Sequence, residues 1–110
     1  MAIERLEFPI SKAEYLLRNT ARGEGGDKQK FWRKILGFER SDAIREAILS
    51  QVTPDLLQAT RSNPYGQCYQ AIIAIKGPSG KTRQIKTIWI VLFEEDIARF
   101  VTAVPYRRKE

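Results

Sequence analysis

The hydrophobic pattern of this chain changes its period near Asn63, and this change is the strongest constraint on the fold. Before Asn63, apolar residues recur at helical spacing, as Phe31, Ile35 and Phe38 do at i, i+4 and i+7. After Asn63, runs rich in Ile, Val and Thr are separated by short turn sequences, which is typical of strands. A helical half followed by a strand-rich half predicts an α+β fold.

The first half is predicted to form about three helices, each with a recognisable start. Ser11, Asp27 and Ser41 are good N-cap residues, and Gly37 can end the second helix in a left-handed conformation. The predicted helices are Lys12–Arg18, Lys28–Leu36 and Asp42–Val52.

The second half is predicted to form an antiparallel β-meander of three or more strands, against which the helices pack. The predicted strands are Gln67–Lys76, Thr82–Phe93 and Ile97–Val104. The second half of Thr82–Phe93 is continuously apolar, which predicts a central strand covered on both faces. With 110 residues, the chain is expected to be a single domain spanning 1–110.

One segment imitates a nucleotide-binding motif. Residues Gly77–Thr82 read Gly-Pro-Ser-Gly-Lys-Thr, like the end of a phosphate-binding P-loop. The motif needs a glycine where this chain has Ile75, and it needs a helix where this chain has a strand pattern. We therefore interpret the segment as a hairpin turn and predict no nucleoside triphosphate site.

The charge balance favours an anionic partner. Nineteen Lys and Arg residues against thirteen Asp and Glu residues give a net charge of +6 and a pI near 9.7. Such a balance is typical of nucleic-acid binding, although it also occurs in proteins that are merely basic. Membrane binding is not expected, because no segment is a basic amphipathic helix with a clean apolar face.

The start of the sequence, Met1–Glu7, lacks the pattern of a secretory signal, so a cytoplasmic location is expected. The lone Cys68 excludes an intrachain disulfide, and it is read as a small buried hydrophobe.

The chain contains no histidine, which removes the usual general base at neutral pH and the commonest metal ligand. Adjacent acids at Glu94–Asp96 are expected to diverge in a turn, so neither a metal nor a cofactor is predicted.

Cations, hydroxyls and aromatic rings are the remaining candidates for function. Lys30 and Lys34 share one face of the second predicted helix, which is either a binding surface or an ordinary solvated face. Lys86 is a cation in a strand that is otherwise becoming apolar, so it either reaches the sheet edge or faces an anion. Tyr65 and Tyr106 lie in predicted turns and are candidates for stacking on bases, whereas Trp89 is better read as core.

Several motifs in order resemble an uncharacterised bacterial domain family, over residues 12–106. The motifs are Gly26–Trp32, Leu36–Phe38, Tyr65-Gly66 with Tyr69, Gly77–Lys81, Lys86–Trp89 and Val101–Pro105. Members of that family occur free-standing and as C-terminal tips of contact-dependent inhibition and other polymorphic toxins. The helix-then-sheet order is similar to the barnase–EndoU–colicin–RelE superfamily of metal-independent ribonucleases.

The resemblance implies a ribonuclease toxin domain that cleaves RNA, with tRNA as a candidate, through attack of the RNA 2′-hydroxyl on the adjacent phosphate. The implied catalytic residues are Lys30, Lys86, Tyr69 and Thr102, with the lysines neutralising the phosphate and moving protons. The implied RNA-binding residues are Lys28, Arg33, Lys34, Tyr65, Thr87 and Tyr106. An acidic antitoxin or immunity protein is the implied protein partner.

A second reading stays open, so catalysis itself is undecided at this point. The same basic surface fits a non-catalytic nucleic-acid-binding or protein-interaction module of a toxin–antitoxin-type system. Convergence of Lys30, Lys86 and Thr102 on one point would favour an active site, and dispersed lysines would favour a binding surface. The sequence does not determine the oligomeric state.

Overall fold

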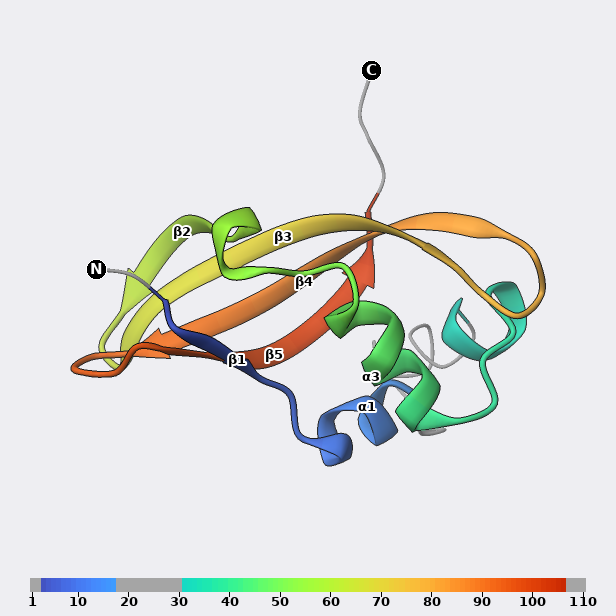
Figure 1. Cartoon of the computed structure of the whole chain (residues 1–110), viewed down its shortest axis with the longest axis horizontal. Helices are drawn as coiled ribbons and strands as arrows, with labels where there is room; N and C mark the ends of the chain where they lie inside the picture. Colours follow the sequence, from blue (N-terminus) through green and yellow to red (C-terminus); the bar gives the residue numbers. More distant parts are fainter. Residues whose placement is uncertain (1–2, 18–30, 107–110) are drawn as a thin grey trace, which may run out of the picture.

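The computed structural model describes residues 3–17 and 31–106 (Figure 1). In chain order, the elements are β1 (Arg5–Glu7), α1 (Ile10–Leu17), the π-helical turn η1 (Phe31–Ile35), α3 (Ser41–Leu49), the 3₁₀ turn η2 (Pro54–Leu56), β2 (Gln58–Asn63), β3 (Gly66–Lys76), β4 (Thr82–Leu92) and β5 (Ile97–Pro105). The predicted α+β class is confirmed: the helical segments lie mainly N-terminal to the strands. None of the described helices is long and apolar enough to cross a membrane.

The strands form one sheet in the order β1-β5-β4-β3-β2. The predicted meander is confirmed as β3, β4 and β5, which pair antiparallel with β4 in the centre. Two short edge strands extend it: β1 runs parallel to β5, and β2 runs antiparallel to β3. β2 carries no apolar alternation and every one of its residues is exposed, so pairing with β3 rather than burial makes it a strand.

The helix starts differ from the prediction by one or two residues. α1 begins at Ile10, so Ser11 lies inside its first turn, and α3 begins at Ser41 itself. The flanking residue of α3 is Arg40, whose side chain makes no capping bond and instead pairs with Asp42 at 2.6 Å. Both serines were therefore wrong as N-caps, because Ser11 lies inside α1 and Ser41 is already the first helical residue of α3.

The second predicted helix is described only from Phe31 onward. There it is a π-helical turn, in which the Leu36 amide donates to the Phe31 carbonyl at 3.1 Å. The predicted cap Asp27 and the segment Lys28–Lys30 lie outside the described residues.

The core lies between α1, α3 and one face of the sheet, where α1 and α3 lie side by side next to β5 and β1 (Figure 1). Aromatic rings dominate this layer: Phe8 stacks on Phe100 with 3.8 Å between ring centroids, and Trp89 meets both rings edge-on. Trp89 is fully buried, as predicted. Its indole N–H donates to the Thr87 hydroxyl at 2.9 Å, and that hydroxyl donates to the Ala71 carbonyl at 2.8 Å.

The Gly77–Gly80 segment is a hairpin turn between β3 and β4, as predicted. This turn is anchored to the end of η1: the Ser79 amide donates to the Leu36 carbonyl at 3.0 Å, and the Ser79 hydroxyl donates to the Ile35 carbonyl at 2.8 Å. A Cβ on Gly77 would collide with the Leu36 carbonyl, so glycine is required for this close approach. The segment that resembles a P-loop therefore has a structural role: it packs the hairpin turn against the end of η1.

Replacing Thr87 by valine should destabilise the fold, because it keeps the shape but leaves the buried Trp89 indole N–H without its acceptor. We expect Thr87→Val to lower the free energy of unfolding by about 1–3 kcal/mol in urea titrations. Thr60→Val is the matched control, since the Thr60 hydroxyl is exposed and donates to the Cys68 carbonyl at 3.2 Å. Equal changes in the free energy of unfolding for the two substitutions would show that the buried Thr87–Trp89 hydrogen bond stabilises the fold no more than an exposed one.

Candidate functional site

The face of the sheet opposite α1 and α3 carries only partly buried or exposed side chains. Along β4, Ile85, Thr87, Trp89 and Val91 are buried, whereas the alternating residues are not. The prediction that this strand is covered on both faces was wrong for the described residues, because helices cover one face only. We call the other side the open face; its side chains include Gln70 and Ile72 of β3, Gln84, Lys86, Ile88 and Ile90 of β4, and Arg99, Thr102 and Val104 of β5.

Lys86 lies in the middle of the open face. It is paired across the sheet with Ile72 on one side and Val104 on the other. Within the described part of the chain, Lys86 forms no hydrogen bond and no ion pair. Because its cross-strand neighbours are aliphatic and it has no carboxylate partner among the described residues, its positive charge is available to an anionic ligand.

Thr102 is a diagonal neighbour of Lys86. It pairs with Ile88, two residues beyond Lys86 on the same face, which corresponds to about 7–8 Å between diagonal positions. This placement depends on a β-bulge: the register passes from Ile88–Thr102 to Trp89–Phe100, which leaves Val101 as the extra residue. Without the bulge, Thr102 would follow the buried side of β5.

Tyr106 lies on the other side of Lys86. Its amide donates to the Gln84 carbonyl at 2.9 Å, which continues the β4–β5 register by one residue and places Tyr106 opposite Gln84. Residues opposite each other share a face, so Tyr106 and Lys86 are also diagonal neighbours. Three of the predicted site residues, Lys86, Thr102 and Tyr106, are therefore brought together.

The other predicted residues of the sheet are not part of this group. Tyr69 pairs with Trp89, so it lies on the opposite face from Lys86. Thr87 is fully buried and holds the Trp89 indole, which removes it from the candidate RNA contacts. Tyr65 is 73% exposed in the β2–β3 turn, about 23 Å along the chain direction of β3 from the position opposite Lys86 at ~3.3 Å per residue.

The η1 residues lie at the end of the sheet that carries the β3–β4 turn. Arg33 donates to the Leu17 carbonyl at 3.5 Å, and Lys34 is exposed. Lys28 and Lys30 lie outside the described residues, so the expected convergence of Lys30 with Lys86 stays a prediction.

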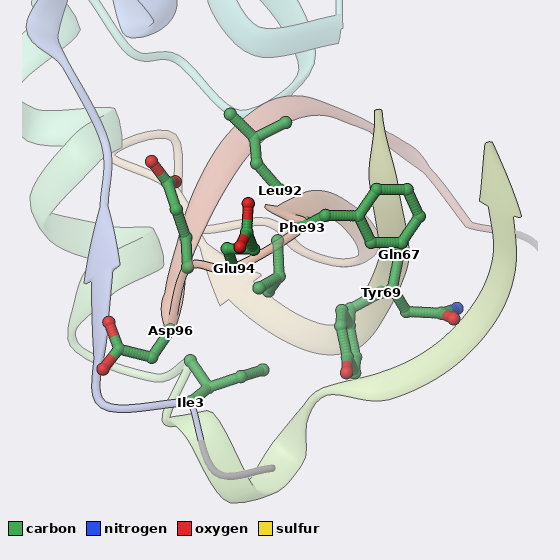
Figure 2. A pocket seen from close by; sticks show the side chains of 9 residues that line it. Ile3, Gln67, Tyr69, Leu92, Phe93, Glu94 and Asp96 are labelled. Atoms are coloured by element: carbon green, nitrogen blue, oxygen red, sulfur yellow. The ribbon is translucent and has the colours of Figure 1, made fainter. Parts of the chain in front are cut away.

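The opposite end of the sheet is acidic. A pocket of about 220 Å³ there is lined by Ile3, Gln67, Tyr69 and Val91–Asp96 (Figure 2). Its polar rim includes three carboxylates of the β4–β5 turn, which would repel a polyanion. In the described ranges, no group of three or more His, Cys, Asp or Glu side chains is arranged to hold a metal ion.

Arg99 adds no free positive charge to the open face. Its guanidinium pairs with Glu7 at 2.5 Å and with Glu95 at 3.2 Å. The hydrogen bond to Glu95, followed by the charges of Glu7 and Glu95, raises the pKa of Arg99. One guanidinium faces two carboxylates, so the formal charges of this ion group sum to a negative value. In the described part of the chain, the open face therefore carries unpaired positive charge at Lys86 in its middle and at Lys76 at its end. Sequence reasoning missed this pairing because Glu7 and Arg99 are 92 residues apart in the chain.

Comparisons with known proteins agree with this architecture. A family model described as "Domain of unknown function (DUF6883)" matches residues 2–107. A search of curated proteins finds no match. One chain of a solved "Contact-dependent growth inhibition toxin - immunity protein complex from Klebsiella pneumoniae 342" is similar with a TM-score of 0.67 and 20% sequence identity, over 90% of this chain and 98% of that chain. At this identity, the similarity shows a shared fold.

If Lys86 serves a ligand rather than the fold, its removal should cost no stability. We expect Lys86→Met to leave the free energy of unfolding unchanged or to raise it by up to about 1 kcal/mol, because an uncompensated ammonium is replaced by a flexible apolar chain. The measurement is urea unfolding, with Lys76→Met as the exposed control. A loss well above 1 kcal/mol for Lys86→Met alone would assign Lys86 a structural role.

Proposed function

Since the chain belongs to the DUF6883 domain family and shares its fold with a chain of a toxin–immunity complex, we propose that it is a toxin-related domain that binds RNA on the open face and cleaves it without a metal. The observation that carries this proposal is the placement of Lys86. It is a cation without a described partner, set among apolar side chains and flanked by the hydroxyl-bearing Thr102 and Tyr106.

A phosphodiester would supply the anion and the hydrogen-bond acceptors that Lys86, Thr102 and Tyr106 can bind. Its negative charge compensates the Lys86 ammonium, and its non-bridging oxygens accept hydrogen bonds from hydroxyls and from the amide of Gln70, which shares the Ile88–Thr102 row. The partly apolar surroundings lower the local dielectric, which strengthens each of these interactions. Such a group stabilises charge that develops on a phosphate during cleavage.

The proposed reaction is transesterification within the RNA. The 2′-oxygen forms a bond to phosphorus and loses its proton to a base, while the bond to the 5′-oxygen breaks and that oxygen receives a proton. The products are a 2′,3′-cyclic phosphate and a 5′-hydroxyl end. Lys86 neutralises the dianionic intermediate, and Lys30 remains the proposed second cation and proton-transfer group. tRNA remains the proposed substrate among cellular RNAs, and the cytoplasm the proposed site of action.

The same face defines the proposed protein partner. An inhibitor that competes with RNA for Lys86 must present carboxylates to a mostly apolar, basic surface. We therefore retain an acidic immunity protein or antitoxin as the partner, in keeping with the complex in which the similar fold occurs.

A second candidate function is an RNA-binding module without catalysis. One observation favours it: among the described residues of the open face, no carboxylate that could act as a general base lies beside Lys86. Glu7 shares this face, but it is paired with Arg99 at the acidic end of the sheet. Such a module would bind RNA through charge and stacking and leave it intact.

The catalytic proposal predicts that purified protein cuts total tRNA in the presence of a metal chelator. Lys86→Ala should lower the cleavage rate by at least about 10²-fold, the scale of a lost acid–base or charge-stabilising group. Thr102→Val should lower it less, since it removes one hydrogen bond from the site. Discrete fragments on a denaturing gel and a cyclic-phosphate end are the readouts.

Arg61→Gln is the control, because Arg61 is an exposed cation on β2 away from Lys86. Intact RNA with wild-type protein, together with Lys86-dependent binding, would favour the non-catalytic module. Cleavage that survives both Lys86→Ala and Lys30→Ala would contradict the assigned site.

A further inference from the structure

The tip of the β3–β4 hairpin and the end of η1 form one anchored unit, although 44 residues separate Ser79 from Ile35 (Figure 1). Ser79 holds them together through two hydrogen bonds, to the carbonyls of Ile35 and Leu36. Gly37 has a φ of 84° and approaches the Ser79 backbone so closely that a Cβ there would lie 2.9 Å from the Ser79 amide nitrogen. The juxtaposition is therefore built into the fold.

This unit gathers positive charge. Lys34 comes from η1, Lys76 from the end of β3, and Lys81 and Arg83 from the turn and the start of β4. Lys76 lies on the Lys86 face and Arg83, opposite Ile75, on the other, so these cations lie on both sides of this end of the sheet. All four side chains are exposed, and none takes part in an ion pair within the described part of the chain. We call these four residues the hairpin-end cluster. By contrast, Arg40 and Arg99 are both paired with carboxylates.

The cluster lies beyond Lys86 on the side away from the acidic β4–β5 turn. Lys86 is paired with Ile72, and the strand pairing ends at Lys76 and Thr82, four residues further along. At ~3.3 Å per residue, this separation is about 13 Å, which is too far for the cluster to contact the phosphate held at Lys86. Its chemistry nevertheless fits the same ligand class, because exposed lysines and arginines bind nucleic-acid phosphates by releasing counterions.

We propose that the hairpin-end cluster is a second RNA-binding subsite, which takes backbone phosphates flanking the nucleotide at Lys86. Ser79 is the positioning residue, because its hydrogen bonds to Ile35 and Leu36 tie the end of η1, which carries Lys34, to the turn that carries Lys81. The inference rests on the proposed function of the open face, and it adds a substrate class: RNA long enough to span both places. The subsite reads no bases, since phosphate contacts carry no direct sequence information.

The test compares two non-cleavable RNAs by fluorescence anisotropy over a range of salt concentrations. One is a 2′-O-methyl dinucleotide, whose single internucleotide phosphate can occupy only one of the two places, and the other is a 2′-O-methyl dodecanucleotide. The cluster variant is Lys34→Gln with Lys81→Gln and Arg83→Gln. The control variant removes the same charge from exposed positions elsewhere, as Arg5→Gln with Lys12→Gln and Arg61→Gln.

The cluster variant should lose affinity for the dodecanucleotide and reduce the slope of log affinity against log salt by about 2, at ~0.7 per phosphate contact on a single strand. Its dinucleotide binding should equal that of the control variant. Ser79→Ala should weaken only dodecanucleotide binding, which a general loss of folding would not do. Thermal unfolding of each variant verifies that the fold is retained.

Equal losses in the cluster and control variants would overturn the subsite, because the effect would then be one of net charge. Dinucleotide binding that requires Lys86, combined with dodecanucleotide binding that does not depend on the cluster, would overturn the subsite and keep the proposed function. Wild-type protein that binds neither RNA would overturn both.

Discussion

The packing of Trp89 against Phe8 and Phe100 is the constraint on which the rest of this structure depends. It fixes which residues of β4 face the helices, and the buried Thr87 hydroxyl holds the indole in place. Because side chains alternate along a strand, this choice also sends Lys86 to the opposite face. A slip of one residue would bury the lysine and expose the tryptophan, so the core strongly disfavours that register. The candidate site is thus a consequence of the core.

Much of the fold can be predicted from periodicity, whereas the membership of the site cannot. Alternating and apolar runs predict β3, β4 and β5, because a strand that is buried on one face needs apolar residues at alternate positions. β2 has no such pattern, since its stability comes from pairing. Lys86 is detectable as a cation within an apolar run. Tyr69 was grouped with it wrongly, because only the register reveals that the two residues lie on opposite faces. The Val101 bulge, which sets the direction of Thr102, leaves no signal in a single sequence.

The two ends of the sheet carry opposite charge. The β4–β5 turn and the Glu7–Arg99–Glu95 group make one end negative, whereas the hairpin tip anchored to η1 makes the other end positive. A polyanion that approaches the open face is therefore drawn toward Lys86 and the tip and repelled from the acidic turn. The Gly-Pro-Ser-Gly turn contributes to this charge distribution through Ser79, whose hydrogen bonds join two segments that are remote in the chain.

Amide chemical-shift mapping by NMR tests whether RNA binds the open face around Lys86. A 2′-O-methyl RNA should shift the amides of β4 and β5 around Lys86 and Thr102 and leave those of Glu94–Asp96 unchanged. Shifts confined to the acidic turn and the pocket beside Tyr69, or the absence of any shift at saturating RNA, would contradict binding at the open face.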